Sequence, residues 1–155
     1  MLLAGCAAAP GGTGGSVPSA ETPVVAAGGA AAYEKLPFVD LVRRSDRVIV
    51  ATVLSTESAW NADKTAIFTT VRLRVEETAK GAGASSIALV VEGGQVGDIA
   101  QAVEGAHQFT VGERLVLFLG GGGIVGGPQG VYAVLDGKVN EQPLSAFLEQ
   151  VRAAK

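Results

Sequence analysis

The chain has 155 residues, about the size of one ordinary domain; 48% of them are hydrophobic and only 17% are charged. This composition is too apolar for a disordered protein, and no apolar run reaches the roughly 18 residues of a transmembrane helix. Twelve Lys and Arg against fifteen Asp and Glu give a net charge of −3, which argues against a nucleic-acid partner. A single Cys excludes an internal disulfide framework and a single His leaves no His pair for a metal site, so we expect neither metal nor cofactor.

The N-terminal residues Leu3-Ala4-Gly5-Cys6 carry the strongest motif, a branched apolar residue and two small residues directly before a Cys. They resemble the lipobox of bacterial lipoproteins. The resemblance implies that Cys6 becomes the first residue of the mature protein and is acylated, with palmitate as one of its chains. Two or three acyl chains hold a protein on a membrane. It also implies a place in the bacterial cell envelope, anchored to the membrane and facing the periplasm or the exterior.

The segment before the lipobox is shorter than a signal peptide. Signal peptides have a basic region and an apolar stretch of 7–15 residues before the cleavage site. Only five residues precede Cys6, and none of them is basic. We therefore expect residues 1–6 to be the remnant of a lipoprotein signal peptide whose start lies upstream. The alternative is a chance match at the start of an Ala- and Gly-rich chain.

Residues 7–32 differ in composition from the rest of the chain. They contain nine Ala, six Gly and three Pro in 26 positions, with Glu21 as the single charge. Ordering such a backbone costs roughly 1–2 kcal/mol per residue, and the segment has no periodic apolar face to bury in return. We predict a flexible tether over residues 7–32 and a folded domain over residues 33–155.

The first half of the domain predicts a short helix and a long β-hairpin. Residues 40–44 follow Pro37, which suits a helix start. Residues 47–59 and 66–78 predict two strands, and 61–64 has the Asn and Asp chemistry of a turn between them. Within the second strand we expect one face to carry the alternate residues Ile67, Thr69, Val71, Leu73 and Val75.

The middle of the domain predicts two more strands separated by a long connection. Residues 86–92 form the first of them, and the connection reaches Phe109. Residues 114–119 are apolar on both faces, which indicates a central strand. The four glycines at 120–123 predict a loop after it.

The C-terminal part predicts a hairpin and a helix. Asp136-Gly137 favours a tight turn between strands over 130–135 and 138–139. A helix is expected from about Pro143. Its apolar stripe consists of Leu144, Phe147, Leu148 and Val151. We expect the domain's own sheet to cover this stripe; the alternative is an exposed helix that binds a partner.

These elements predict a mainly β fold, a small OB-like barrel of five or six strands with a short N-terminal helix and a C-terminal helix. The arrangement is similar to the OB fold of netrin domains and tissue inhibitors of metalloproteinases. The segments that carry the resemblance are 45–53, 68–71, 75–77, 80–81, 92–94 and 111–114, within 45–119. The disulfides of the animal inhibitors are missing, and Cys6 lies far from the domain. Their inhibition through a free N-terminal Cys is therefore not expected.

Three features of the sequence have residue types found in chemical sites. Gly121-x-Gly123-x-x-Gly126 matches the dinucleotide fingerprint in spacing, but a further predicted strand follows it where that motif needs a helix. His107 has no second His or Cys beside it and is expected to be a surface or loop residue. Glu76 and Glu77 are adjacent on a predicted strand and are expected to point to opposite faces.

The turn of the long hairpin offers a candidate partner contact. Trp60 lies beside the turn that contains Asn61 and Asp63. Trp is enriched at binding hot spots, so these three residues are candidates for contact with a partner. The alternative is that Trp60 folds back as a lid over one end of the barrel.

The sequence thus favours a non-enzymatic, lipid-anchored exported module of the bacterial envelope that binds another envelope component. Two alternatives stay open. One is a hydrolase with an unrecognised active site, and the other is a purely structural envelope module. An unknown envelope protein and the membrane itself are the expected partners.

Overall fold

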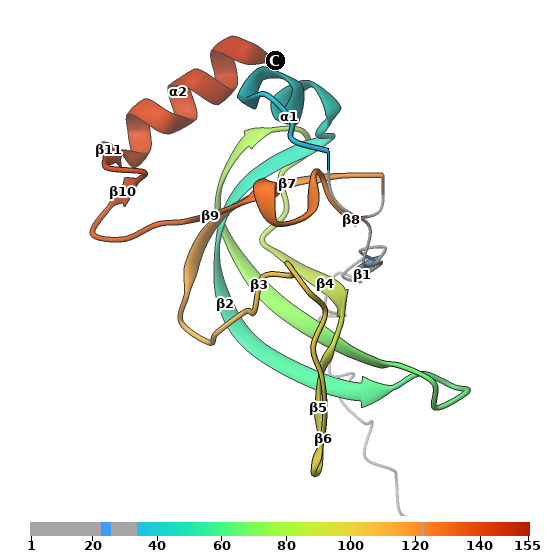
Figure 1. Ribbon diagram of the computed structural model, residues 1–155. Helices are drawn as coiled ribbons and strands as arrows, with labels where there is room; N and C mark the ends of the chain where they lie inside the picture. Colours follow the sequence, from blue (N-terminus) through green and yellow to red (C-terminus); the bar gives the residue numbers. More distant parts are fainter. Residues whose placement is uncertain (1–22, 26–33, 122) are drawn as a thin grey trace, which may run out of the picture.

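The computed structural model describes residues 23–25, 34–121 and 123–155. The elements, in chain order, are β1 (Pro23–Val25), α1 (Phe38–Arg44), β2 (Arg47–Trp60), β3 (Ile67–Lys80), β4 (Ser86–Glu92), β5 (Gly94–Val96), β6 (Ile99–Gln101), β7 (Arg114–Gly120), β8 (Gly123–Ile124), the 3-10 helix η1 (Gly127–Gly130), β9 (Val131–Ala133), β10 (Lys138–Val139), β11 (Gln142–Pro143) and α2 (Leu144–Ala154). The prediction of a mainly β fold with a short helix near each end of the domain is confirmed (Figure 1).

The main sheet has seven strands in the described part of the chain. Their order is β1-β4-β3-β2-β7-β8, and β9 also pairs with β7. All neighbours are antiparallel except β1 and β4, which are parallel. The prediction of five or six strands was too low, because β1 lies in the predicted tether and β8 begins inside the predicted glycine loop.

A long hairpin of β2 and β3 forms the centre of this sheet. Each strand has 14 residues, and the pair curves strongly so that its turn lies far from both helices (Figure 1). The predicted alternation along β3 is confirmed where it matters most, since Ile67, Val71 and Leu73 are fully buried. Three register shifts interrupt the pairing with β2. Bulges of this kind increase the local twist and bend the strands, which agrees with the curvature.

The two faces of the sheet bury two separate clusters. The helical core consists of Leu41, Val42, Val48, Val50, Ala79, Val116, Phe118, Val134, Val139, Phe147, Leu148 and Val151. The sheet core consists of Ile49, Ala51, Val53, Val71, Leu73, Ile87, Leu89, Leu115, Leu117 and Leu119. Strands β2 and β7 contribute alternate residues to both clusters, so they have no solvent face over these positions. The prediction that 114–119 is a central strand is confirmed.

Helices α1 and α2 cover the helical core. The predicted stripe of α2 is confirmed, because Phe147, Leu148 and Val151 are buried against the protein's own sheet and α1. The alternative of an exposed partner-binding stripe is therefore wrong. Ring contacts join the two helices to the strands: the Phe147 ring lies 5.5 Å from Phe38 and 5.1 Å from Tyr132.

Three smaller elements differ from the sequence prediction. The long connection after β4 contains the hairpin β5–β6, held by pairing of Gly94 with Gln101. The strand predicted over 130–135 is shorter, and β10 pairs mainly with β11. The tight turn at Asp136-Gly137 is confirmed, since both residues have positive φ and a bridge joins Leu135 to Lys138.

Candidate functional site

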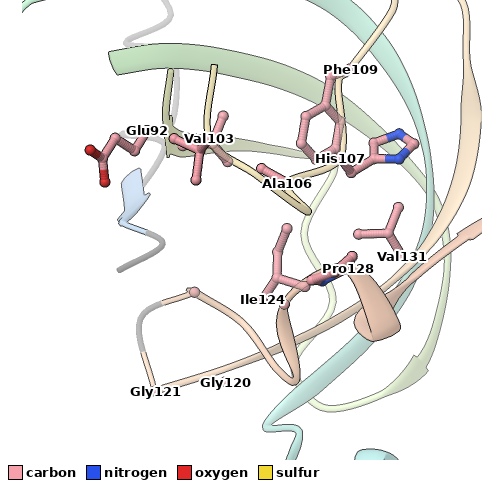
Figure 2. Close-up of a pocket in the computed structure, with 13 residues that line it drawn as sticks. Glu92, Val103, Ala106, His107, Phe109, Gly120, Gly121, Ile124, Pro128 and Val131 are labelled. Carbon is pink, nitrogen blue, oxygen red and sulfur yellow. The ribbon is translucent and has the colours of Figure 1, made fainter. Parts of the chain in front are cut away.

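An open seam lies between β4, the second strand in the order of the main sheet, and β8, the last. A cavity of about 160 Å³, called here the seam pocket, separates the end of β4 from β7, β8 and η1 (Figure 2). Its apolar wall consists of Val91, Val103, Phe109, Ile124, Pro128 and Val131. Four of these, Val91, Phe109, Ile124 and Val131, also pack against the sheet core. The pocket is therefore an apolar opening onto the sheet core.

A larger and more polar cavity adjoins the seam pocket. This polar cleft, about 370 Å³, lies along the same 102–109 connection and shares Val91, Val103, His107 and Phe109 with the pocket. Side chains of the distal β2–β3 hairpin and of β6 form its other walls. These include Thr56, Ser58, Thr69 and Gln101.

Most polar side chains of the cleft are bonded to the protein itself. The hydroxyls of Ser58 and Thr69 lie 2.8 Å apart, and the Thr69 hydroxyl donates to the Gly93 carbonyl at 2.7 Å. The Gln101 side chain accepts the Ile67 backbone N–H at 2.8 Å. It also donates to the Glu92 carboxylate at 3.2 Å. These bonds hold the β5–β6 hairpin against β3 and shape the cleft.

His107 lies where the two cavities meet. It belongs to a loop, as predicted, but it is half-buried and lines both cavities. Its Nε2 is 3.1 Å from one carboxylate oxygen of Glu113, and its ring meets Phe109 edge-on at 4.9 Å. The Thr110 backbone N–H donates to the same Glu113 carboxylate at 3.2 Å. A carboxylate therefore fixes the orientation of the imidazole at the mouth of the seam pocket.

The residues predicted from the hairpin turn lie elsewhere. Trp60 is half-buried at the end of β2, in register with the buried Ile67, and lines neither cavity. Asn61 has a structural role: its side-chain oxygen accepts the backbone N–H of Thr65 at 2.8 Å and of Ala66 at 3.2 Å. Asp63 is exposed. Cys6 lies outside the described residues.

The prediction that Glu76 and Glu77 point to opposite faces is wrong. A register shift pairs Val50 with Glu77 but Ala51 with Val75, so Glu76 is an extra residue and both carboxylates lie on the helical-core face of the sheet. Glu77 pairs with Arg152 of α2 at 2.6 Å.

Glu76 has a different partner. It pairs with Arg114 of β7 at 2.5 Å. This hydrogen bond is the main reason why the pKa of the Glu76 carboxyl lies below its usual value, and partial burial opposes it. Both carboxylates are engaged in structural ion pairs.

The glycine motif does not form a nucleotide site. Gly121 and Gly123 flank the β7–β8 turn, and Gly126 precedes the four-residue η1 with a φ of 70°. A strand follows η1, as the sequence predicts, so the fold offers no full helix N-terminus for a pyrophosphate at this position.

Over residues 23–25, 34–121 and 123–155, no group of three or more His, Cys, Asp or Glu side chains could hold a metal ion. No helix in those ranges has the length and apolar character needed to cross a membrane. No protein-family model, no curated protein and no solved structure matches the chain.

The seam pocket was missed in the sequence because its walls are far apart along the chain. Val91 belongs to β4 and Ile124 to β8, and β3, β2 and β7 lie between these two strands in the sheet order. One feature did point to it. The connection between residues 93 and 113 is long, and long connections in small domains are commonly functional. His107 had no pattern of its own, since its partner Glu113 is recognised only when the loop folds back.

Proposed function

We propose that this chain is a non-enzymatic, lipid-anchored exported domain of the bacterial envelope, and that it binds a protein partner at the seam pocket. In this proposal the domain is a partly open barrel of OB type, in which β4 and β8 flank the seam pocket. The observation that carries the proposal is the apolar cavity of about 160 Å³ between these two sheet ends. An opening onto an apolar core is favourable for an apolar group that fills it.

The volume of the pocket limits what enters it. An engineered apolar cavity of about 150 Å³ in another protein stays dry and holds benzene. The seam pocket, at about 160 Å³, is therefore suited to one aromatic or aliphatic side chain. The neighbouring His107 and Glu92 supply polar groups at its rim. An apolar wall with a few polar groups at the mouth is typical of specific binding sites.

Variants that fill the pocket test binding. Ala106 lines the pocket but is itself exposed, so Ala106→Phe places a ring over the opening with little cost in folding. Ala62→Phe, at the exposed hairpin turn and outside both cavities, is the matched control. We expect cross-linking in the native envelope to recover one stoichiometric partner with the parent chain and with Ala62→Phe, and to lose it with Ala106→Phe. Equal recovery with all three proteins contradicts binding at the seam.

The proposed anchor is tested separately. We expect Cys6→Ser, expressed from the full-length reading frame, to move the protein from the membrane fraction to the soluble fraction, because the acylated thiol is lost. Ser replaces the sulfur of Cys by oxygen, so the acyl acceptor is removed while the side chain stays small. An unchanged distribution between the two fractions contradicts lipidation at Cys6.

A hydrolase is the second candidate, and the His107–Glu113 pair at the pocket is the observation that favours it. A carboxylate that orients an imidazole is part of many hydrolytic sites. The hydroxyls of Ser58 and Thr69 in the adjoining cleft, however, are bonded to each other. If the chain is a hydrolase, His107→Gln abolishes turnover of a chromogenic short-chain ester. If it is a binding domain, the parent chain has no such turnover to lose.

A further inference from the structure

We propose that the outer edge of β4 accepts an extended segment of a partner protein as an added parallel strand, and that this segment places one apolar side chain in the seam pocket. This inference rests on the proposed binding function and names the class of partner. It follows from three observations on the edge, its direction and its present occupant.

The outer edge of β4 is only partly paired. On its inner side, β4 pairs with β3 over its whole length, from Ser86 to Glu92. On its outer side, β1 pairs only with Ala88–Val90. In the part of the chain that the structure describes, Val91 and Glu92 have no strand partner on this side. Such an edge presents backbone N–H and C=O groups to any extended chain that lies beside it.

The direction of the pairing leads to the seam pocket. Because β1 is parallel to β4, a strand that follows its path continues from Val90 toward Val91 and Glu92. Both of these residues line the seam pocket, and β1 lies on the same side of the pocket as Glu92 (Figure 2). At about 3.3 Å per residue, two further residues bring the added strand to the opening. Successive side chains point to opposite faces, so only one of those two residues faces the pocket.

The chain's own β1 identifies the chemistry that the edge accepts. Its sequence, Pro23-Val24-Val25, has two β-branched residues that favour an extended backbone. With three paired residues it is a short strand, and pairs of this length are weak. A longer segment that also fills the seam pocket displaces it. Strand addition with side-chain pockets is an established mode of peptide recognition, in which the backbone supplies affinity and the pocket supplies specificity.

The internal strand competes with the partner segment. Whenever β1 occupies the edge, the edge is closed to other chains. The apparent affinity for a partner is therefore the intrinsic affinity multiplied by the fraction of time that the edge is free. Weakening β1 therefore raises the affinity for a peptide added in solution. If a partner bound in the seam pocket without pairing to the β4 edge, weakening β1 would not change its affinity.

Three synthetic peptides test the proposal on the full chain carrying Cys6→Ser. The first has the sequence of residues 21–27, Glu-Thr-Pro-Val-Val-Ala-Ala, with a fluorophore at its N-terminus. The second and third carry Phe in place of Ala26 or of Ala27. Fluorescence anisotropy is measured with the parent chain and with a V24P/V25P variant, whose prolines remove two backbone donors from β1.

We expect the V24P/V25P chain to bind all three peptides about tenfold more tightly than the parent, because the edge is no longer occupied. One Phe peptide, and only one, should bind a further tenfold or more tightly than the Ala peptide, because its ring is buried in the seam pocket. Adding Ala106→Phe should remove that gain and leave binding of the Ala peptide unchanged. Amides of Val91 and Glu92 should become protected from hydrogen exchange when the peptide binds.

Two results overturn the proposal. One is the absence of peptide binding to the V24P/V25P chain, and the other is equal binding of the Ala and both Phe peptides. Neither result contradicts the proposed binding function, which depends on recovery of an envelope partner that Ala106→Phe abolishes. If that recovery is observed while the peptides fail, a partner binds at the seam in another way.

Discussion

The helical core and the sheet core are built on the same strands but are closed in different ways. Val48 and Val50 of β2 point into the first, and Ile49 and Ala51 point into the second. Two helices cover the helical core with buried side chains. The sheet core is covered by the curvature of its own strands and by irregular connections, and it remains accessible at the seam pocket.

A small domain can in this way combine a closed core with an accessible cavity. Helix α2 presents one continuous apolar stripe, so each of its turns fills space over the sheet. The 102–109 connection contributes the half-buried Val103, His107 and Phe109 and the exposed Ala106 to its side of the seam. A connection with so few buried residues leaves a cavity where a helix would leave none. The closed helical core thus lies on one face of the sheet, and the core that opens at the seam pocket lies on the other.

The largest expected effect is in the helical core. Phe147 is 2% exposed and contacts the rings of Phe38, Phe118 and Tyr132. Phe147→Ala should lower the free energy of unfolding by about 3–5 kcal/mol, because it removes a buried ring and leaves a cavity. Thermal and urea unfolding of the full chain measure this change.

The matched control for that substitution is Glu149→Ala, on the exposed side of the same helix. It should change the free energy of unfolding by no more than about 0.5 kcal/mol. If Phe147→Ala melts within a degree or two of the parent, α2 does not close the helical core. The two cores would then not differ in the way they are covered.

An intermediate effect is expected at the polar cleft. A Cβ on Gly94 would lie 2.3 Å from the Thr69 hydroxyl and 2.4 Å from the Ser58 hydroxyl, at a φ of 136°. Gly94→Ala should therefore cost about 2–4 kcal/mol, from backbone strain and the loss of the hydrogen bond between these hydroxyls. Urea unfolding gives the magnitude, and loss of the Ser58–Thr69 pair is followed by NMR of the two hydroxyl-bearing residues.

Gly97 provides the control in the same hairpin. Its φ is 58° and no atom lies within 4 Å of an added Cβ. Gly97→Ala should cost only about 1–2 kcal/mol, the strain of a left-handed backbone. Equal losses for Gly94→Ala and Gly97→Ala would mean that the close contacts at the cleft contribute nothing.

The sequence predicts the elements whose side chains alternate against a core, and it fails where pairing depends on distant residues. The strand over 86–92 and the stripe of α2 follow from local patterns of apolar residues. The hairpin β5–β6 has no such pattern. The side chain of Gln101 in β6 holds the hairpin against β3 by accepting the backbone N–H of Ile67. Among the described residues, strand β1 pairs with β4 alone, and β4 is far from it in the sequence.

The candidate site follows the same rule. The motif at Cys6 is local and can be recognised from four residues, whereas the seam pocket brings together Val91 and Ile124 from different parts of the chain. His107 joins Glu113 across a loop whose course no local pattern specifies. The positions proposed to bind a partner are therefore the least predictable, because they lie where the regular elements stop.

The smallest expected effect concerns Glu76, which joins β3 to β7. Its pKa is lowered chiefly by the hydrogen bond from Arg114, so the folded state favours the charged carboxylate. The resulting stability is present above the unfolded-state pKa and is lost as the pH falls through the lower folded-state pKa. Because this pair is near the surface, its contribution should be only about 0.2–1 kcal/mol.

Urea unfolding of the parent and of Glu76→Gln measures this contribution. The difference in the free energy of unfolding between these two proteins should have its maximum value at neutral pH. It should shrink below a pH of about 4.5, the ordinary pKa of a Glu carboxyl. Glu104→Gln, at an exposed position, is the control and should show no such trend. A difference that grows toward low pH contradicts the assigned ion pair.

The hydrogen bonds of Asn61 have a consequence for how the chain finds its native pairing. Residues 48–51 are fully buried and apolar, so sliding β2 by one residue would exchange one apolar set for another in the two cores. Burial alone penalises such a slip weakly, and loop length then decides the register of the hairpin. By tying Thr65 and Ala66, Asn61 fixes that length. The side-chain amide of Asn61 thus sets the register at the turn end of the hairpin, and the three register shifts then set it for the valines of β2.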